Sequence, residues 1–493
     1  MRYAIRTFGC QMNVHDSERM DEVLRAAGHL EATGPEAADF IVLNTCSVRD
    51  KAEQKLSSEV GRLRKLKQRR PELLLVVAGC MAQKEGERLI ERMPSVDVVV
   101  GPDNIAELPV LLEAAELGGP PAVRTVFDVD APRFLPVGAP RAGAATAYVT
   151  IMKGCDERCS FCIVPYTRGP ERYRPSREIV EEIGALAAAG VREVTLLGQT
   201  VNSYADPLGE LPPAPGARAD DPDESEFAAL LRAIAARVPA LGRLRYTSPH
   251  PRHVTPSLVL AHAELAVLPR HVHLPVQSGS DRMLRRMIRR YTRAEYVERA
   301  RALQAAAPGL GLSTDVIVGF PSEQDEDFEA TLSLVDEIGF RGVFGFKYSP
   351  RPHTPALRLG DDVSEDVKRD RLTRLFERSD ALLAAHLATL VGTQQRVLVE
   401  GPSKPGASSL TGRTEQNEIV HLYGDAAAPS AGAGVASAAR ALVGRTVTVR
   451  IARANKHSLQ GELGEADAAE LRARSVVDPP ARRALPVVQG AEG

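Results

Sequence analysis

The chain has 493 residues, enough for about three domains, and 26% of them are charged, an ordinary share for a globular protein. Sixty-two lysines and arginines against 64 aspartates and glutamates give a net charge of −2, which excludes a histone-like polycation but not a local nucleic-acid-binding patch. No apolar run of about 18 residues occurs, and the N-terminus lacks the layout of a signal peptide, so we expect a cytoplasmic protein without a membrane partner.

Residues 1–118 alternate β-rich runs with helical stretches, which predicts βαβ units around an open parallel sheet. Ser17 is the expected N-cap of the first helix, and Gly28 is its expected stop signal. The expected strands lie at residues 3–8, 40–43, 73–78 and 96–100, and the expected helices at residues 17–27, 50–69 and 83–92.

Three cysteines follow the predicted strands of this first domain, and we call Cys10, Cys46 and Cys80 the wide triad. Because the carboxyl ends of parallel strands meet at one edge of a sheet, these thiols should converge where open α/β sheets bind ligands. Three buried structural thiols are the alternative, although such thiols would fall within the strands rather than just past them.

A linker rich in Pro, Gly and Ala is expected at residues 119–145, and a second α/β region at residues 146–385. Six strand–helix units in this region predict a partial or full (β/α)6 barrel with its active site at the carboxyl ends of the strands. Residues 205–226, rich in Pro and Asp, are expected to be a disordered insertion. The expected strands lie at residues 147–152, 193–197, 243–247, 271–274, 312–318 and 342–347, and two of the helices at residues 176–189 and 323–338.

Residues 391–465 consist of short β runs separated by Gly and Pro, which predicts a small C-terminal β-barrel. Its expected strands lie at residues 395–400, 418–422 and 446–451, with a loop at residues 426–439. Residues 466–493 are expected to be a flexible tail.

The strongest motif is M-K-G-C-D-E-R-C-S-F-C-I-V-P-Y at residues 152–166, and we call its Cys155, Cys159 and Cys162 the close triad. Two sets of three thiols in a chain with six cysteines indicate metal rather than disulfides. Iron–sulfur clusters are held by such thiolates, and three protein ligands leave one iron open for reaction. Zinc would need a fourth ligand, and no histidine lies within this loop.

The C-x3-C-x2-C spacing at the start of a β/α barrel resembles the radical S-adenosylmethionine (SAM) superfamily. The resemblance extends to the methylthiotransferases over nearly the whole chain. TFGCQMN, LNTCSVRDKAEQK and GCMAQ resemble their N-terminal domain, and LLGQTVNSY, SPHPRH, LPVQSGSDRMLRRM, STDVIVGFP and FKYSPRP resemble their radical SAM core. The terminal β-barrel is similar to a TRAM domain, an RNA-binding module. QMN after Cys10 and NTCSVR are most similar to the branch that modifies tRNA.

The resemblance implies an enzyme that inserts a methylthio group at carbon 2 of N(6)-dimethylallyladenosine at position 37, next to the anticodon of tRNA. It implies two 4Fe-4S clusters and SAM as cofactors. The close triad would bind the catalytic cluster that cleaves SAM to a 5′-deoxyadenosyl radical, and the wide triad would bind an auxiliary cluster that carries the sulfur. Such chemistry suits an unactivated C–H bond, which offers no acid–base handle.

Glu323 is the residue that the resemblance places in the SAM pocket, in the segment after GFP. Four positions depart from the family pattern. The family usually has Gly, Thr, Gly and Asn where this chain has Ser322, Gln324, His353 and Thr200. None of these departures removes a cysteine.

Several basic residues have a less specific pattern. Three arginines follow the close triad and are candidates for substrate phosphate or the SAM carboxylate: Arg168, Arg172 and Arg174. Four more recur at helical spacing and are expected to share one face that could contact RNA: Arg282, Arg286, Arg289 and Arg293. Two histidines alternate on a predicted strand and are expected to be packed or hydrogen-bonded rather than ligands: His271 and His273.

Other functions remain open from the sequence. The same chemistry could act on threonylcarbamoyl-modified adenosine in tRNA or on a ribosomal protein. A non-enzymatic iron–sulfur protein for RNA binding or electron transfer is a further alternative, which two three-cysteine sites disfavour. The expected partners are tRNA and an electron donor such as flavodoxin or ferredoxin, and the expected state is a monomer.

Overall fold

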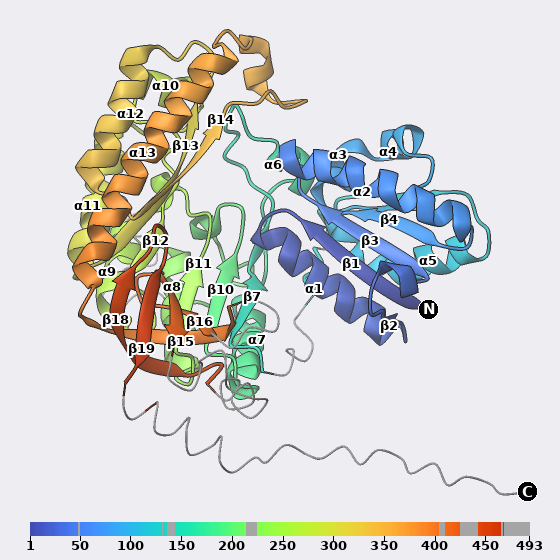
Figure 1. The fold of residues 1–493 in the computed structure, drawn as a ribbon, viewed down its shortest axis with the longest axis horizontal. Helices are drawn as coiled ribbons and strands as arrows, with labels where there is room; N and C mark the ends of the chain where they lie inside the picture. Colours follow the sequence, from blue (N-terminus) through green and yellow to red (C-terminus); the bar gives the residue numbers. More distant parts are fainter. Residues whose placement is uncertain are drawn as a thin grey trace, which may run out of the picture. The chain divides into compact units, whose positions relative to one another are not determined.

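A computed structural model describes residues 1–47, 50–130, 132–135, 143–212, 224–403, 410–423, 442–464 and 467 (Figure 1). The chain forms two compact units. The first contains Met1–Pro140, Ala147–Ala189 and Glu193–Ser379, and the second contains Arg141–Thr146, Gly190–Arg192 and Asp380–Gly493. None of the helices in the described part of the chain combines the length and the apolar character that a membrane span requires. The expected barrel loop, half of the expected insertion and all but one residue of the expected tail lie outside the described residues.

A six-stranded sheet in the order β2-β1-β3-β4-β5-β6 forms the N-terminal part of the first unit, and its neighbouring strands are all parallel. The strands are β1 (Arg2–Phe8), β2 (Leu30–Glu31), β3 (Phe40–Thr45), β4 (Leu74–Ala78), β5 (Val98–Val100) and β6 (Ala122–Arg124). The central strands β3, β4 and β5 are buried throughout, as expected for apolar runs covered by helices on both faces. The prediction of an open parallel sheet is confirmed, but β6 lies in the segment expected to be a linker and instead extends the sheet.

Helices cover both faces of this sheet (Figure 1). They are α1 (Gln11–Ala26), α2 (Asp50–Arg69), α3 (Cys80–Glu85), α4 (Glu87–Arg92) and α5 (Leu108–Glu116). Met20 of α1 and Leu108 of α5 belong to one core, whereas Leu56 of α2 and Leu89 of α4 belong to the other.

Helix α1 begins at Gln11, well before the expected N-cap Ser17. Cys10 occupies the N-cap position, and its backbone N–H donates to the Asn13 side chain at 3.3 Å. The Ser17 hydroxyl is used elsewhere, because it accepts a hydrogen bond from the Asn44 side chain at 2.9 Å. The prediction of Ser17 as the cap was therefore wrong.

The radical-SAM-like region contains all six expected strands, arranged in two three-stranded sheets in the orders β11-β10-β7 and β12-β13-β14. These strands are β7 (Thr146–Thr150), β10 (Glu193–Leu197), β11 (Arg243–Tyr246), β12 (His271–His273), β13 (Gly311–Val318) and β14 (Gly342–Lys347). A short antiparallel pair, β8 (Met152–Lys153) and β9 (Arg172–Tyr173), brackets the close triad. The strand–helix alternation confirms the predicted partial barrel.

The helices of this region follow the strands in turn. They are α6 (Val164–Arg168), α7 (Ser176–Ala188), α8 (Glu226–Arg237), α9 (Pro256–Glu264), α10 (Asp281–Arg286), α11 (Arg293–Ala306), α12 (Asp325–Ile338) and α13 (Glu365–Leu390). A small core of Met283, Met287, Phe320 and Tyr348 packs against Phe161, which lies between the last two cysteines of the close triad. This apolar packing holds the close-triad loop in place.

The second unit contains a closed barrel of five strands in the order β15-β16-β17-β19-β18. The strands are β15 (Gln394–Pro402), β16 (Leu410–Arg413), β17 (Ile419–Tyr423), β18 (Thr446–Ala454) and β19 (Leu459–Leu463). Val397, Val420, Val447 and Leu459 fill its interior. The predicted small β-barrel is confirmed, although β16 and β19 were not predicted because glycines and polar residues interrupt their short apolar patterns.

Candidate functional site

The wide triad lies at the carboxyl ends of β1, β3 and β4, which are neighbours in the sheet, as predicted. Cys46 follows β3 and its N–H donates to the carbonyl of Phe8, at the end of β1. Cys80 opens α3, and Gly79 before it has a φ of +90° and would place a Cβ 2.2 Å from the Asn44 side chain. The tight G-C step is therefore required to bring Cys80 beside the other two strands.

Two buried asparagines fix the wide-triad loops, and their role was not foreseen. The Asn44 side-chain amide donates to the backbone carbonyl of Asn13 at 2.7 Å. The Asn13 side-chain amide donates to the side-chain oxygen of Asn44, Oδ1, at 3.3 Å. Both residues sit within motifs that carry a wide-triad cysteine, Q-M-N and N-T-C, but the sequence alone does not show that they meet. Their hydrogen bonds connect the Cys10 loop to the Cys46 strand.

The wide-triad thiols interact with one another. A hydrogen bond from the Cys46 thiol, despite the opposing effect of burial, lowers the pKa of Cys10 to about 6. Burial raises the pKa of Cys80, and the negative charge of Cys10 adds to that rise. Cys10 therefore interacts with both other thiols of the wide triad, as expected for ligands of one cluster.

The close triad lies in the loop between β8 and α6. Cys155 and Cys159 are 9% and 8% exposed. The Cys155 sulfur lies 3.0 Å from the Thr200 hydroxyl, and Arg289 donates to the Cys159 sulfur at 3.3 Å. Burial raises the pKa of Cys155 to about 11 and that of Cys162 to about 12, so these thiols are costly to ionise without a cation.

The donor sets fit iron–sulfur clusters. All six cysteines are free, and each triad gathers three of them at a buried or half-buried position. In a site for a single metal ion, all donor atoms would lie within 4.8 Å of one another. Among the described residues, the three sulfur atoms of neither triad meet that distance. Thiolate donors with wider spacing suit a polynuclear cluster with one iron left free of protein ligands.

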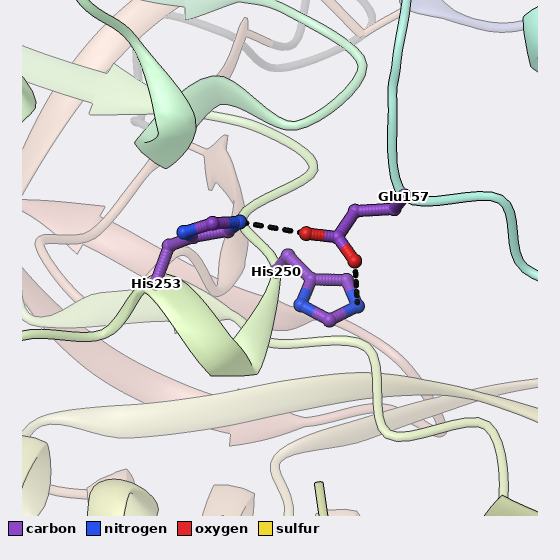
Figure 2. Close-up of side chains that lie close together, drawn as sticks. All are labelled: Glu157, His250 and His253. Atoms are coloured by element: carbon purple, nitrogen blue, oxygen red, sulfur yellow. Dashed lines mark hydrogen bonds and ion pairs between the residues drawn. The ribbon is translucent and has the colours of Figure 1, made fainter. Parts of the chain in front are cut away.

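Glu157 follows Cys155 by two positions in the sequence and is buried. Figure 2 shows that its carboxylate points toward two imidazoles, those of His250 and His253. Glu157 Oε1 lies 2.7 Å from His253 Nε2 and 3.1 Å from the Arg252 guanidinium, and Oε2 lies 3.9 Å from His250 Nε2. His250 is the N-cap of a short 3-10 turn after β11, η4 (Pro251–His253), and His253 is the last residue of that turn. We call this arrangement the carboxylate clamp. The sequence analysis missed it, because Glu157 and His253 are 96 positions apart in the chain.

The carboxylate clamp has the spacing of a site for a single metal ion, but the His250 nitrogen that faces Glu157 carries a proton and is therefore not a free ligand. Its three donor groups lie within 4.8 Å of one another. However, His250 Nδ1 accepts the Arg252 backbone N–H at 3.2 Å, which leaves the proton of a neutral imidazole on Nε2. A metal would have to displace that proton and compete with the Arg252 guanidinium, so the arrangement favours an anchored carboxylate over a metal site.

Glu323, expected in the SAM pocket, is buried and engaged within the protein. Its carboxylate accepts the Gly319 N–H at 2.6 Å and an Arg371 N–H at 2.8 Å. Burial raises the pKa of Glu323 to about 7 in spite of these donors. The side chain therefore braces the loop between β13 and α12, and a direct contact with SAM stays a prediction.

The arginines after the close triad do not offer free cations to a phosphate or to SAM, in contrast to the expectation. Arg168 pairs with Asp16, and Arg172 pairs with Asp103. Arg174 pairs with Glu182 on the following helix. Burial of each guanidinium against a carboxylate partner explains why these basic residues are structural.

The four arginines from Arg282 onward also do not share one helical face. Helix α10 ends at Arg286, so Arg289 lies in a loop and Arg293 begins α11. Arg282 pairs with Asp327, and Arg289 points to the close triad. The expected RNA-contacting face is therefore absent among these residues.

His271 and His273 both hydrogen-bond with the Ser313 hydroxyl, at 3.0 and 2.9 Å. The prediction that they are hydrogen-bonded within the protein is confirmed.

Three protein-family models match successive segments of the chain. Residues 2–101 match the family described as "Uncharacterized protein family UPF0004", residues 149–335 match the radical SAM superfamily, and residues 388–463 match the TRAM domain.

Curated relatives cover almost the whole chain. A protein of Sorangium cellulosum, named tRNA-2-methylthio-N(6)-dimethylallyladenosine synthase, is 68% identical over 100% of this chain and 99% of its own. Relatives of the same name from Bordetella petrii and Leptothrix cholodnii are 44% and 46% identical, over 94% and 93% of this chain and 91% and 92% of theirs.

Solved structures resemble the chain more distantly. The radical SAM methyltransferase TsrM from Kitasatospora setae, with cobalamin and a [4Fe-4S] cluster bound, is 16% identical over 72% of this chain and 77% of its own, with a TM-score of 0.49. The cobalamin-dependent SAM radical enzyme OxsB is 13% identical over 77% of this chain and 56% of its own, with a TM-score of 0.47.

Proposed function

Because the chain belongs to the family of tRNA-2-methylthio-N(6)-dimethylallyladenosine synthases, we propose that it is a radical SAM tRNA methylthiotransferase. Its reaction is the insertion of a methylthio group at carbon 2 of N(6)-dimethylallyladenosine at position 37, next to the anticodon. The observation that carries this proposal is the 68% identity to a curated synthase over the full chain, together with two gathered cysteine triads.

The two triads are the proposed ligands of two 4Fe-4S clusters. The close triad would hold the cluster that binds and cleaves SAM, and the wide triad would hold the auxiliary cluster that provides sulfur. When bound, these clusters supply the electron for SAM cleavage and the sulfur for transfer, chemistry that side chains alone cannot provide.

The chain's own residues prepare the close triad for this task. Arg289, 5% exposed, donates to the Cys159 sulfur and to the carbonyl of Pro275, so its charge is fixed beside the thiolate. The Thr200 hydroxyl contacts Cys155, where the family usually has Asn. Burial of the loop excludes water from the sulfur ligands, which supports thiolate–iron bonds over hydrolysis.

Glu323 takes part in the SAM pocket, in our proposal, by shaping the loop after β13. Its bonds to Gly319 and Arg371 hold that loop at the carboxyl end of a barrel strand, where such folds bind their substrates.

The proposed partners follow from the reaction. tRNA is the substrate, and the barrel of the second unit, which matches the TRAM domain, would add affinity for it. An electron donor such as flavodoxin or ferredoxin would reduce the close-triad cluster. We propose a monomer that acts in the cytoplasm, where tRNA is modified.

Mass spectrometry of tRNA nucleosides from a deletion strain tests the proposal. We expect the 2-methylthio derivative of N(6)-dimethylallyladenosine to disappear and its unthiolated precursor to accumulate. Complementation with the full chain should restore the product, and complementation with close-triad alanine variants should not. Unchanged levels, or loss of the methylthio group from threonylcarbamoyl-adenosine instead, would contradict the assignment.

A further inference from the structure

Arg168 is a buried cation at the end of α6, six positions beyond the last cysteine of the close triad by its number, yet it points into the N-terminal domain. Its guanidinium donates to both carboxylate oxygens of Asp16, at 3.4 and 2.5 Å, and its Nε donates to the Cys80 sulfur at 3.2 Å. Arg168, Asp16 and Cys80 are each 6% exposed. A side chain of the radical-SAM-like region therefore completes the surroundings of the wide triad.

Pairing with Asp16 alone would not require this geometry. The two terminal nitrogens of Arg168 serve the carboxylate in a fork, which leaves Nε–H free to be aimed at a third group. That group is a sulfur atom of the wide triad, which lies in the same compact unit. A lysine could neutralise Asp16, but it could not also present a fixed planar N–H to Cys80.

The backbone around Arg168 is fixed as firmly as its side chain. The Arg168 carbonyl accepts a hydrogen bond from Arg172 at 2.6 Å, and the next residue, Gly169, accepts the N–H of Cys155 at 3.1 Å. Arg172 is itself held by Asp103 of the N-terminal domain at 2.5 Å. The same short segment thus bonds to the close triad through its backbone and to the wide triad through a side chain.

We propose that Arg168 is a positioning residue of the auxiliary cluster: it orients the Cys80 ligand and favours the more negative, reduced state of the cluster by donating to its sulfur. Hydrogen bonds to cluster sulfurs raise the reduction potential because they stabilise the added negative charge. The inference rests on the proposed function in that it assumes a cluster on the wide triad. Arg289 has the corresponding place at Cys159 of the close triad.

The test is a redox titration, followed by electron paramagnetic resonance, on full-length protein in which the close triad is replaced by alanine. Only the auxiliary cluster then contributes a signal. Arg168→Gln alone would leave the Asp16 charge buried and unpaired, which endangers folding. The informative variant is therefore the double substitution Asp16→Asn with Arg168→Gln, and the matched control is Asp16→Asn alone.

We expect the potential of the auxiliary cluster to shift to a more positive value in the Asp16→Asn control, because a buried anion is removed while the Arg168 donor stays. In the double variant it should shift to a more negative value than in that control. Arg168→Lys, with Asp16 intact, keeps the charge but loses the Nε–H donor, so the potential of the auxiliary cluster should be more negative than with Arg168.

Equal potentials in the double variant and the Asp16→Asn control would overturn the inference while leaving the proposed function intact. Absence of iron from the wide triad in the parent protein would overturn both. As a selectivity check, the reciprocal protein carries alanines at the wide triad and retains only the close-triad cluster. There, Arg289→Gln should shift the potential and the Asp16/Arg168 double substitution should not; the opposite pattern would also contradict the inference.

Discussion

Two residues adopt a left-handed backbone at positions where the resembling family usually has glycine. Ser322 has a φ of +62° and His353 a φ of +69°. A side chain in this conformation costs roughly 1–2 kcal/mol, which glycine avoids. The departures from the family pattern are thus conformationally costly replacements at turns whose shape is retained.

Ser322→Gly is expected to stabilise the protein by about 1 kcal/mol, since relief of backbone strain exceeds the entropy that glycine adds to the unfolded chain. The Ser322 hydroxyl also lacks a hydrogen-bond partner among the described residues, so its loss removes a desolvation penalty. Urea unfolding would measure the change. Ser322→Ala removes the hydroxyl but keeps the strain and should gain less; a glycine variant no more stable than the alanine variant would contradict the argument.

The buried His262 is expected to make the free energy of unfolding depend on pH in the acid range. Burial in α9 lowers the pKa of His262 to about 4, and its Nε2 lies 2.7 Å from the Tyr246 hydroxyl. Because the unfolded chain binds the proton more readily, with a pKa near 6.5, stability is retained above that pH and is lost as the pH falls toward 4. The expected loss is roughly 3 kcal/mol at about 1.4 kcal/mol per pKa unit.

His262→Gln keeps a hydrogen-bonding partner for Tyr246 but cannot titrate, so the free energy of unfolding should fall less steeply between pH 6.5 and 4 than in the wild type. Denaturant titrations across this range provide the measurement. His457→Gln, at a side chain that is 59% exposed, is the control and should follow the wild type. Parallel curves for wild type and His262→Gln would refute the role given to burial.

At the level of single residues, the cysteines could be located from the sequence and their partners could not. Each wide-triad cysteine follows a strand, and strand ends in a parallel sheet converge by topology. The Arg168–Asp16 contact joins residues of α6 and α1 that are 152 positions apart, and no local pattern encodes it. For that reason Arg168 was expected to contact a ligand and instead pairs within the protein.

Among the secondary-structure elements of the first unit, the strands with a clear apolar run were predicted well, and two short strands at the edges of the N-terminal sheet were missed. The strands β3 and β4 are buried throughout and β13 is mostly buried, and all three match the expected ranges closely. β2 and β6 have two and three residues and gain their order only from pairing with β1 and β5. Tertiary pairing therefore decided the end of the N-terminal sheet, where composition suggested a linker.

The C-terminal barrel presents a basic strand and turn, which we expect to contact the RNA backbone. Arg450, Arg453 and Lys456 are exposed along β18 and the turn after it. Lys456 pairs with Asp380, and Arg450 pairs with Glu462. The two cations are 72% and 58% exposed, so these pairs are weak competitors for phosphate.

Replacing Arg450, Arg453 and Lys456 together with alanine is expected to weaken tRNA binding and to reduce the slope of log affinity against log salt by about 2 to 3, if each cation meets one phosphate. Filter binding at several salt concentrations would measure both. Arg369→Ala, which removes one exposed cation of α13 in the first unit, serves as a control for loss of a surface charge outside the barrel. An unchanged salt slope in the triple variant would exclude this strand from the RNA interface.

The two cysteine triads lie in two different regions of the same compact unit: the wide triad in the N-terminal sheet and the close triad in the radical-SAM-like region. Carboxylates of the N-terminal domain, Asp16 and Asp103, each pair with an arginine from the segment that follows the close triad. Buried pairs of this kind resist separation because breaking one leaves an uncompensated charge. The contacts fix the two regions to each other without merging their cysteine loops.

This separation predicts that the two triads fail in different ways. Alanine at all three positions of the wide triad should leave reductive SAM cleavage measurable and eliminate the methylthio product. The close-triad loop is held independently by its contacts with Thr200 and Arg289 and by the packing of its own Phe161 against a small apolar core. Alanine at the close triad should abolish SAM cleavage while the wide triad keeps about four irons. Iron analysis, 5′-deoxyadenosine release and tRNA nucleoside analysis on both variants provide the measurements. If the close-triad variant still releases 5′-deoxyadenosine, or if the wide-triad variant still makes methylthio product, the division of roles between the two triads is wrong.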